Sequence, residues 1–422
     1  MTCIISEKMW GERSIHIPNV TDVYGSDMVG SFIDNYQTRV LCLLAKEQKI
    51  LLPERHKEAA LNLLNYFQKI GFNYLDINNL IFINDFGNKS FEIGSLALSV
   101  GDAITELSDT KFKQIVPFFS SATVELLVHK YKKTTHLSHA LACLLNDKGH
   151  LRDILVKEGI RVTGSNKVSI FQKDYLEKCL DIYEDLKNKG IKEFAVIIPK
   201  SCSGAGIHRF SNATELMNII SQLTNVEEFL IDPWYGDNIG SPSYQIFIAD
   251  KPEDDICIGL TDQMLDDCVH LGNLYPSIFT NEKVIDEIFY KVIKVLRDRG
   301  ARGMLGVDLL IRRVNGKIIP YILEVNARQT GAVYAGFLAY SLRNSARKPW
   351  IGHNNIILPK GTTLEEYHEY LISQHADFKI GDTEGIIITC NGNLSHNKIM
   401  VLIMANTSER LYELLDIAEN MK

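Results

Sequence analysis

The segment GVDLLIRRVNGKIIPYILEVN, residues 306–326, is the part of the chain whose fold the sequence constrains most. Two apolar runs flank an Asn-Gly dipeptide, a combination that is typical of a tight β-hairpin. In the second run and just after it, Glu324, Asn326 and Arg328 stand two residues apart, so an extended strand points all three side chains to one face. A buried carboxylate without a partner is unfavourable, and the hairpin therefore predicts a compensated polar site.

The length of the hairpin loop decides whether Asp308 joins this face. With a two-residue loop at Asn315 and Gly316, Asp308 lies opposite Leu323 and faces away from Glu324. With a three-residue loop, in which Gly316 takes the left-handed position of a β-bulge, the pairing shifts by one residue and Asp308 shares the face of Glu324. The carboxylate site considered next requires the three-residue loop.

Carboxylates gathered in an apolar strand need a compensating cation, and a hard divalent ion is the natural one. Mg²⁺ takes oxygen ligands from one or two carboxylates and from substrate phosphates, and Mn²⁺ suits a similar set. Asp308, Glu324 and the amide oxygen of Asn326 fit this requirement. Two alternatives remain open: Glu324 pairs with Arg328 in a structural salt bridge, and Asp308 is a solvated strand residue.

A second group of candidate residues follows the apolar strand EFAVIIP. Lys200 ends this strand and opens the loop SCSGAG, residues 201–206. Glycines allow successive backbone amides to converge on an anion, and a lysine at the mouth of the loop adds a point charge for a phosphate. The loop is not a P-loop, because its glycines follow the lysine instead of preceding it. The alternative is a plain turn.

Read in chain order, the segments NDKGHLRDILVKEGI, FAVIIPKSCSGAG, EEFLI, GVDLL and YILEVNARQTG resemble the ATP-grasp superfamily, over about residues 140–340. The resemblance implies that ATP lies between two α+β halves. It also implies that Lys148, at the start of a helix, and Lys200 hold the ATP phosphates under a glycine-rich lid loop. The residues implied in that loop are Ser203, Gly204 and Gly206.

The same resemblance gives roles to further residues. The hinge that binds adenine corresponds to EEFL, through Glu227 and the backbone near Leu230. The three oxygen ligands named above correspond to the metal ligands of the family. Arg328 corresponds to an arginine that steadies the acyl-phosphate or the tetrahedral intermediate, so Arg328 and Lys200 are the catalytic candidates.

The expected fold class is α/β (α+β), in three parts. Short apolar runs such as KILLP and the helical stretch HKEAALNLLNYFQKI indicate an α/β unit that resembles a pre-ATP-grasp domain. A two-lobed ATP-grasp domain and a small C-terminal α+β appendage follow. The boundaries predicted are 1–105, 106–340 with a lid around 160–235, and 341–422.

The C-terminal segment, with PKGTTLEEYHEYL and GIIITC, is similar to the tail of natural-product amino-acid and peptide ligases, such as the pheganomycin peptide ligase and the butirosin glutamate:acyl-carrier-protein ligase. This resemblance implies an ADP-forming ligase of antibiotic biosynthesis, which joins an activated amino acid, with glutamate as one candidate, to an amine or a carrier-protein thiol. Gln263 and Thr330 are predicted to line its substrate pocket. The alternatives are an ATP-binding regulatory protein without turnover and a carboxylase-like enzyme that uses bicarbonate.

Charge and composition limit the other partners. The chain carries 45 Lys and Arg against 52 Asp and Glu, a net charge of −7, and no dense basic run, which argues against nucleic acid as a partner. No apolar run is long enough for a membrane span, and we expect a cytoplasmic protein. The eight cysteines are scattered without a Cys-x-x-Cys pair. The histidines His136, His139 and His368 have no zinc-site spacing and are interpreted as surface or packing residues.

Overall fold

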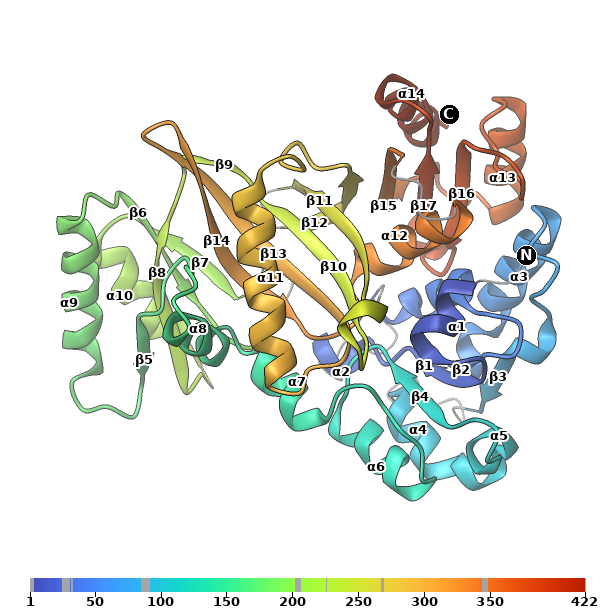
Figure 1. The fold of residues 1–422 in the computed structure, drawn as a ribbon, viewed down its shortest axis with the longest axis horizontal. Coiled ribbons are helices and arrows are strands. Elements are labelled where there is room, and N and C mark those ends of the chain that lie inside the picture. The colour runs from blue at the N-terminus through green and yellow to red at the C-terminus, as the bar shows by residue number, and fades with distance from the viewer. Residues whose placement is uncertain are drawn as a thin grey trace.

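The structure of the protein is a computed structural model, which describes residues 4–24, 31, 33–84, 92–201, 206–224, 226–266, 269–343 and 348–421. Within these ranges, the strands form three sheets, of four, nine and four members (Figure 1). One sheet is parallel and two are antiparallel, and helices pack on them. The α/β (α+β) class predicted from the sequence is confirmed.

The N-terminal unit is built around a parallel sheet with strand order β3-β2-β1-β4. Its strands are β1 (Ser14–Ile17), β2 (Lys49–Pro53), β3 (Leu80–Ile83) and β4 (Gln114–Pro117). The helices of this unit are α1 (Ile4–Trp10), α2 (Thr21–Tyr24), η2 (Asp34–Leu43), α3 (Lys57–Lys69), α4 (Ile93–Val100), α5 (Thr105–Ser108) and α6 (Ala122–Lys130). Because β4 pairs with β1, the unit extends beyond residue 105, the boundary predicted from the sequence. A four-residue strand shows no clear periodicity, and its partner is far away in the sequence.

The central sheet is antiparallel, with strand order β14-β13-β10-β11-β12-β15-β17-β16 and β9 paired to β13. Its strands are β9 (Asn238–Gly240), β10 (Pro242–Ile248), β11 (Ile256–Asp266), β12 (Val269–Tyr275), β13 (Gly303–Val314), β14 (Lys317–Asn326), β15 (Trp350–Ile357), β16 (Gly385–Cys390) and β17 (Lys398–Met404). The helices packed on it are α7 (His139–Asn146), α8 (Lys148–Lys157), α11 (Lys283–Asp298), α12 (Gly331–Leu342), α13 (Leu364–Ser373) and α14 (Ser408–Glu419). Residues 272–275 of β12 pair with β15. The C-terminal segment therefore continues the central sheet and is not the separate appendage that the sequence predicted.

The N-terminal and C-terminal parts share one apolar core. Leu64 and Phe67 of α3 belong to the same buried cluster as Ile387 of β16 and Leu402 of β17. The backbone N–H of Ile388 also donates to the Tyr66 hydroxyl across this contact. Contacts between parts so distant in the sequence explain why local patterns did not reveal this arrangement.

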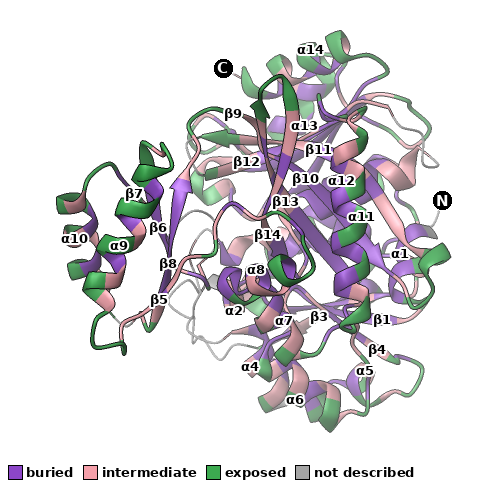
Figure 2. Ribbon diagram, turned by 60° about the vertical axis from the view of Figure 1, so that its left-hand side comes forward, coloured by how far each residue is buried: buried purple, intermediate pink, exposed green. Residues whose placement is uncertain are grey.

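The lid sheet is a separate antiparallel layer, with strand order β5-β8-β6-β7. Its elements are β5 (Lys167–Ser169), α9 (Tyr175–Asn188), β6 (Glu193–Ile197), β7 (Ile207–Phe210), α10 (Ala213–Gln222) and β8 (Glu228–Trp234). Both helices cover one face and enclose a small core of their own (Figure 2). Gly190, two residues after the end of α9, has a φ of +82°, a left-handed conformation that glycine adopts readily after a helix. The other face of the sheet is turned to the central sheet.

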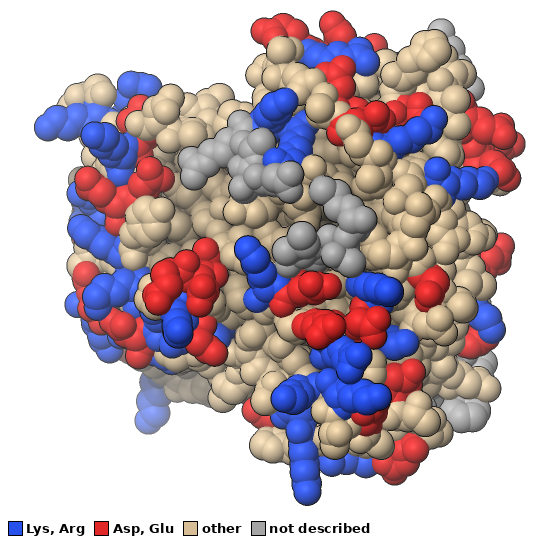
Figure 3. All heavy atoms as spheres, turned by 45° about the vertical axis from the view of Figure 1, so that its right-hand side comes forward, with Lys and Arg blue, Asp and Glu red and all other residues tan. Residues whose placement is uncertain are grey.

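The surface of the molecule carries charges of both signs. On the face shown in Figure 3, lysines and arginines lie among aspartates and glutamates, without one continuous positive field. No helix in the described ranges combines the length and the apolar character needed to cross a lipid bilayer. An anionic ligand therefore has to be held by a few well-placed groups.

Candidate active site

The turn of the β13–β14 hairpin contains two residues, not three. Asn315 and Gly316 both have positive φ angles, of 51° and 76°. The flanking residues Val314 and Lys317 pair directly. This is the geometry in which an Asn-Gly turn suits the twist of a hairpin, because both residues accept a left-handed conformation. The predicted three-residue loop is therefore wrong.

A β-bulge restores the shared face that the three-residue loop was meant to provide. Leu309 pairs with Ile322, but Asp308, the residue just before Leu309 in β13, pairs with Glu324 and not with Leu323. Leu323 is the extra residue, and it shifts the register by one. Asp308 and Glu324 consequently lie side by side on one face, as the sequence analysis required.

The bulge is held by a buried arginine. Arg152 of α8 is only 1% exposed, and its Nε and Nη2 donate to the Leu323 carbonyl at 3.3 and 3.2 Å. Its Nη1 forms an ion pair with Asp232 of β8 and donates to the Gly164 carbonyl at 3.1 Å. Gly164 and Asp232 lie where the chain enters and leaves the lid sheet. Arg152 therefore joins both ends of the lid to the strand that carries Glu324.

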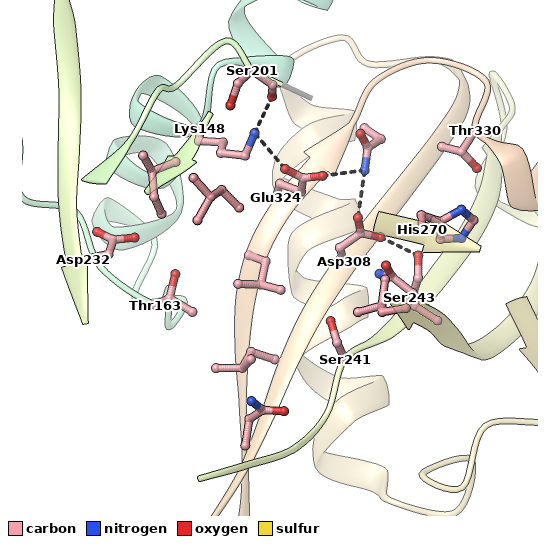
Figure 4. Close-up of a pocket in the computed structure, with 18 of the residues that line it drawn as sticks. Lys148, Thr163, Ser201, Asp232, Ser241, Ser243, His270, Asp308, Glu324 and Thr330 are labelled. Carbon is pink, nitrogen blue, oxygen red and sulfur yellow. Dashed lines mark hydrogen bonds and ion pairs between the residues drawn. The ribbon is translucent and has the colours of Figure 1, made fainter. Parts of the chain in front are cut away.

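The amide of Asn326 connects the two carboxylates, Asp308 and Glu324, which are labelled in Figure 4. Its Nδ2 donates to Asp308 Oδ2 at 2.9 Å and to Glu324 Oε1 at 3.2 Å. Its Oδ1 accepts from Arg328 Nη2 at 2.7 Å. The Ser243 hydroxyl donates to the other oxygen of Asp308 at 2.6 Å. The sequence analysis thus named three residues of the cluster and its arginine, but not Ser243.

Lys148, the first residue of α8, connects this cluster to the lid. Its Nζ lies 2.9 Å from Glu324 Oε2 and donates to the Ser201 carbonyl at 2.7 Å. The lysine is only 8% exposed. The sequence left open a salt bridge between Glu324 and Arg328. In the structure Glu324 pairs with Lys148 instead, and Arg328 donates to the amide oxygen of Asn326.

The surroundings shift the pKa values of the two carboxyls in opposite directions. Burial raises the pKa of the Asp308 carboxyl above its ordinary value, and adjacent Glu324 raises it further. Burial acts on the pKa of Glu324 in the same direction, but Lys148 and Arg328 outweigh it and lower that pKa. Two neighbouring carboxyls with pKa values pushed apart are characteristic of functional sites.

The donor atoms of this cluster suit a magnesium ion. Mg²⁺ prefers oxygen ligands, with one or two carboxylates and the rest from phosphates and water. Asp308 and Glu324 supply the carboxylates, and the Asn326 N–H₂ group already occupies the place between them that a cation would take. The Asn326 oxygen faces Arg328, so the amide must turn over before it can bind a metal. Among the described residues, no group of three or more His, Cys, Asp or Glu side chains could hold a metal ion, so this site depends on two carboxylates together with the amide of Asn326.

These side chains line one end of a cavity of about 450 Å³ between the central sheet and the lid. The lid contributes Ala195, Ile197 and Ile207, and the central hairpin contributes Leu310 and Leu323. The cavity is therefore apolar near the lid and strongly polar near the carboxylates. Such a gradient suits a ligand with a flat apolar part and an anionic part.

The predicted hinge residues do not line this cavity. Glu227 is exposed before the start of β8, and Leu230 is fully buried opposite Ile197. Residues 232–235, which follow the predicted strand, form the cavity wall instead. The reason is that β8 is longer than EEFLI, and its pairing with β6 places Asp232 opposite the lining residue Ala195.

Lys200 is also placed differently from the prediction. It is exposed and is absent from the cavity wall. Its charge instead lowers the pKa of Cys143 on α7, against a larger rise caused by burial. Pro199, which is buried, separates Lys200 from the end of β6. The side chain therefore does not line the cavity that holds the carboxylates.

Ser203 and Gly204, predicted in the lid loop, lie outside the described residues. Gly206 is described, and its carbonyl accepts from the Ile198 N–H at 2.8 Å. A Cβ atom at Gly206 would come within 2.3 Å of the Ser201 side chain. Close approach of the two ends of the loop thus requires a glycine at this position.

Beyond the carboxylates, at the end of the cavity away from the lid, the wall includes Gln263 and Thr330, both predicted from the sequence. This end is called the far end. The Thr330 hydroxyl donates to Gln245 Oε1 at 2.8 Å, and Gln245 Nε2 donates to the Ser243 hydroxyl at 2.8 Å. A chain of hydrogen bonds therefore runs from Thr330 to Asp308. Ser243 and Gln245 were missed, although their spacing of two in the apolar strand SYQIFI is the signal that identified Glu324 and Asn326.

Two further polar residues of this end were also missed. His270 and Asn273 of β12 line the cavity next to Thr330. They occur in VHLGNLY, three residues apart in a strand with no other polar side chain. That spacing places their side chains on opposite faces of a regular strand, and a histidine in a strand is no sign of function by itself.

Comparison with known proteins gives a family match and similar solved structures, but no match among curated protein sequences. Residues 183–332 match the family model described as ATP-grasp domain. The N5-carboxyaminoimidazole synthetase of Staphylococcus aureus, solved with ADP, is similar in fold with a TM-score of 0.60 and 13% identity, over 98% of this chain and 98% of that chain.

Two carboxylase structures have the same degree of likeness. A biotin carboxylase from Campylobacter jejuni, solved as a complex with β-γ-ATP, has a TM-score of 0.60 and 13% identity over 96% of this chain and 90% of that one. The biotin carboxylase domain of the Hydrogenobacter thermophilus 2-oxoglutarate carboxylase, solved with MgADP, ADP and bicarbonate, has a TM-score of 0.60 and 11% identity over 97% and 89%. The arrangement of the three sheets is therefore that of the ATP-grasp fold.

Proposed function

We propose that this chain, which has the ATP-grasp fold, is an ADP-forming ligase that activates a carboxylate as an acyl-phosphate. The observation that carries the proposal is the cluster of Asp308, Glu324 and Asn326, flanked by Lys148 and Arg328, at the polar end of the cavity below the lid. Phosphoryl transfer needs positioning and charge compensation more than a protein nucleophile. This cluster supplies both.

The cavity suggests how ATP binds. Its apolar end, between the lid and Leu310, suits the adenine ring, and residues 232–235 offer backbone groups at its edge. Tyr235 is held there by Arg312, whose guanidinium lies 3.9 Å from the centre of the tyrosine ring. The phosphates then extend toward Lys148. Solved structures of similar fold contain ADP, MgADP or β-γ-ATP, which supports a nucleotide as the ligand of this cavity.

The residues of the polar end divide the work of the first reaction step. A substrate carboxylate attacks the terminal phosphorus of ATP, and ADP leaves. Lys148 neutralises charge on the phosphoryl oxygens, and Arg328 holds the substrate carboxylate in line for attack. Asp308 and Glu324 would hold Mg²⁺, which would supply positive charge against the repulsion between the anionic groups of the two reactants. In the second step a nucleophile displaces phosphate from the acyl group.

The finer proposal concerns the two substrates. The donor is an amino acid, with glutamate as one candidate, and the acceptor is an amine or the thiol of an acyl carrier protein. This assignment rests on the similarity of the C-terminal segment to natural-product ligases and places the reaction in antibiotic biosynthesis. Gln263 and Thr330 would contact the donor at the far end of the cavity. Mn²⁺ would serve in place of Mg²⁺.

One alternative is favoured by a specific observation. The solved structures with similar folds include carboxylases, and one of these contains bicarbonate. A carboxylase-like enzyme would activate bicarbonate in place of an amino acid. Formation of ADP that depends on bicarbonate would distinguish this alternative from the ligase.

The test uses the purified full-length protein with ATP, Mg²⁺ and hydroxylamine. Each common amino acid is added in turn as donor, and bicarbonate is added in a parallel series. The nucleotide product and any hydroxamate are identified. For every active donor, each common amino acid then replaces hydroxylamine as the acceptor amine.

We expect ADP and a hydroxamate from one donor. Formation of AMP would contradict the acyl-phosphate mechanism and indicate adenylation. Binding of ATP without any product across all donors would favour a regulatory ATP-binding protein.

A further inference from the structure

His270 is a partly exposed histidine at the far end of the cavity that the proposed first step does not use. It lies beside Thr330, on the same side of the cavity as Ser243 and Asp308 (Figure 4). A Cβ atom on Gly331, the first residue of α12, would lie 3.5 Å from the His270 ring. The imidazole therefore lies beside the first residue of α12, three residues after Arg328, and at this end of the cavity the acyl group would be held.

A chain of hydrogen bonds determines which ring nitrogen carries the proton. The Thr261 hydroxyl donates its single hydrogen to the Ser243 carbonyl at 3.0 Å, so its oxygen must accept from the Asn273 amide nitrogen at 2.9 Å. The Asn273 oxygen consequently faces His270 Nε2, at 2.7 Å. An amide oxygen can only accept, so Nε2 carries the hydrogen and Nδ1 keeps a lone pair.

The surroundings keep this lone pair available. Burial lowers the pKa of His270 below its ordinary value, and the positive charges of Arg328 and Arg39 lower it further, against a rise from the Asn273 hydrogen bond. His353 on β15, another titratable group close by, has a pKa lowered to about 4 because of burial and is neutral at pH 7. Asn354 Nδ2 is the neighbour of Nδ1, at the long distance of 3.4 Å. It can yield this place to a substrate N–H.

We infer that His270 is the general base of the second step, and this inference rests on the proposed function. The lone pair of an acceptor amine forms the new C–N bond with the acyl-phosphate carbon. The C–O bond to the phosphate breaks, and its electron pair leaves on the phosphate oxygen. The proton from the amine nitrogen passes to His270 Nδ1, while Nε2–H stays bonded to Asn273.

The kinetic test compares two nucleophiles in the wild type and in His270→Asn. Hydroxylamine is unprotonated at neutral pH and attacks acyl-phosphates without a base, whereas an ordinary amine needs one. With the active donor and amine from the screen above, we expect His270→Asn to slow amide formation at least about a hundredfold while hydroxamate formation changes less than about threefold. Added imidazole should restore amide formation in His270→Ala. His353→Asn removes a neighbouring buried histidine outside the cavity and should change neither rate.

Equal loss with both nucleophiles, or no loss with either, would overturn the general base and leave the ligase proposal intact. A wild-type protein that forms no ADP with any donor would contradict the ligase instead. A second readout does not depend on turnover: ¹⁵N NMR of histidine-labelled protein, with His270→Asn for assignment. We expect a neutral Nε2–H tautomer at pH 7, and a protonated ring or an Nδ1–H tautomer would overturn the inference.

Discussion

The two ends of the cavity differ in how closely the sequence reveals them. At the carboxylate end, Asp308 and Glu324 come from two strands joined by a two-residue turn, so a local pattern predicts which side chains meet. At the lid end, the wall depends on the pairing of β6 with β8, which lie far apart in the sequence. There the prediction named Leu230, which is buried, whereas Asp232, two residues later, lines the cavity. Local pairing reveals a site more reliably than pairing across a domain.

The two ends also differ in what holds them. Ion pairs and hydrogen bonds connect the carboxylate end to Lys148 and Arg328. The lid has its own small apolar core and meets the rest of the cavity through Arg152 and through the bond from Lys148 to the Ser201 carbonyl. We therefore expect substitutions at the first end to affect the chemistry, and substitutions at the second to affect lid position and stability.

The largest effect is expected at the carboxylate pair. Asp308→Ala and Glu324→Ala should each lower the rate of ADP formation at saturating ATP and Mg²⁺ by about a thousandfold, because the charge on the phosphates is then no longer balanced. The matched control is Asp298→Asn, which removes an exposed carboxylate on α11. Wild-type rates in either alanine variant would show that the pair is structural and that the metal lies elsewhere.

The next largest difference is expected between the two lysines predicted to hold phosphates, Lys148 and Lys200. Lys148→Ala should lower the rate of ADP formation by about a hundredfold, because it removes a cation that lies 2.9 Å from Glu324 at the polar end. Lys200→Ala should change the rate much less, because Lys200 is exposed and outside the cavity wall. Steady-state kinetics with varied ATP measures both. A large rise in the ATP requirement of Lys200→Ala would show that the loop turns this lysine inward when the lid closes.

A third comparison concerns the link between the two ends. Arg152→Met should lower the free energy of unfolding by about 3 to 5 kcal/mol, because Asp232 is then left buried without its partner. Urea unfolding followed by circular dichroism measures the change. The double variant Arg152→Met with Asp232→Leu should recover much of the loss, since no charge is left unpaired. If the double variant is no more stable than the single one, the loss of stability comes mainly from the lost hydrogen bonds to Leu323 and Gly164, and not from the unpaired charge of Asp232.

Much of the carboxylate end was predictable, for physical reasons that the lid end lacks. The Asn-Gly turn determines its own hairpin, and alternation along β14 determines which side chains share a face. The bulge at Leu323 was not predictable, because it depends on Arg152, far away in the sequence. The same holds for His270, whose neighbours Asn273 and Asn354 come from two strands that only the folded sheet brings together.

The smallest effect tests where the register of the hairpin is set. Gly316→Ala places a Cβ at a residue with a φ of +76° and should lower the free energy of unfolding by about 1 kcal/mol. The rate of ADP formation and its dependence on Mg²⁺ should stay at the wild-type level, because the bulge, and not the turn, aligns Asp308 with Glu324. Thermal unfolding and a magnesium titration on the same preparation measure both quantities. A changed magnesium requirement in Gly316→Ala would mean that the turn controls the alignment after all, and that the bulge follows from it.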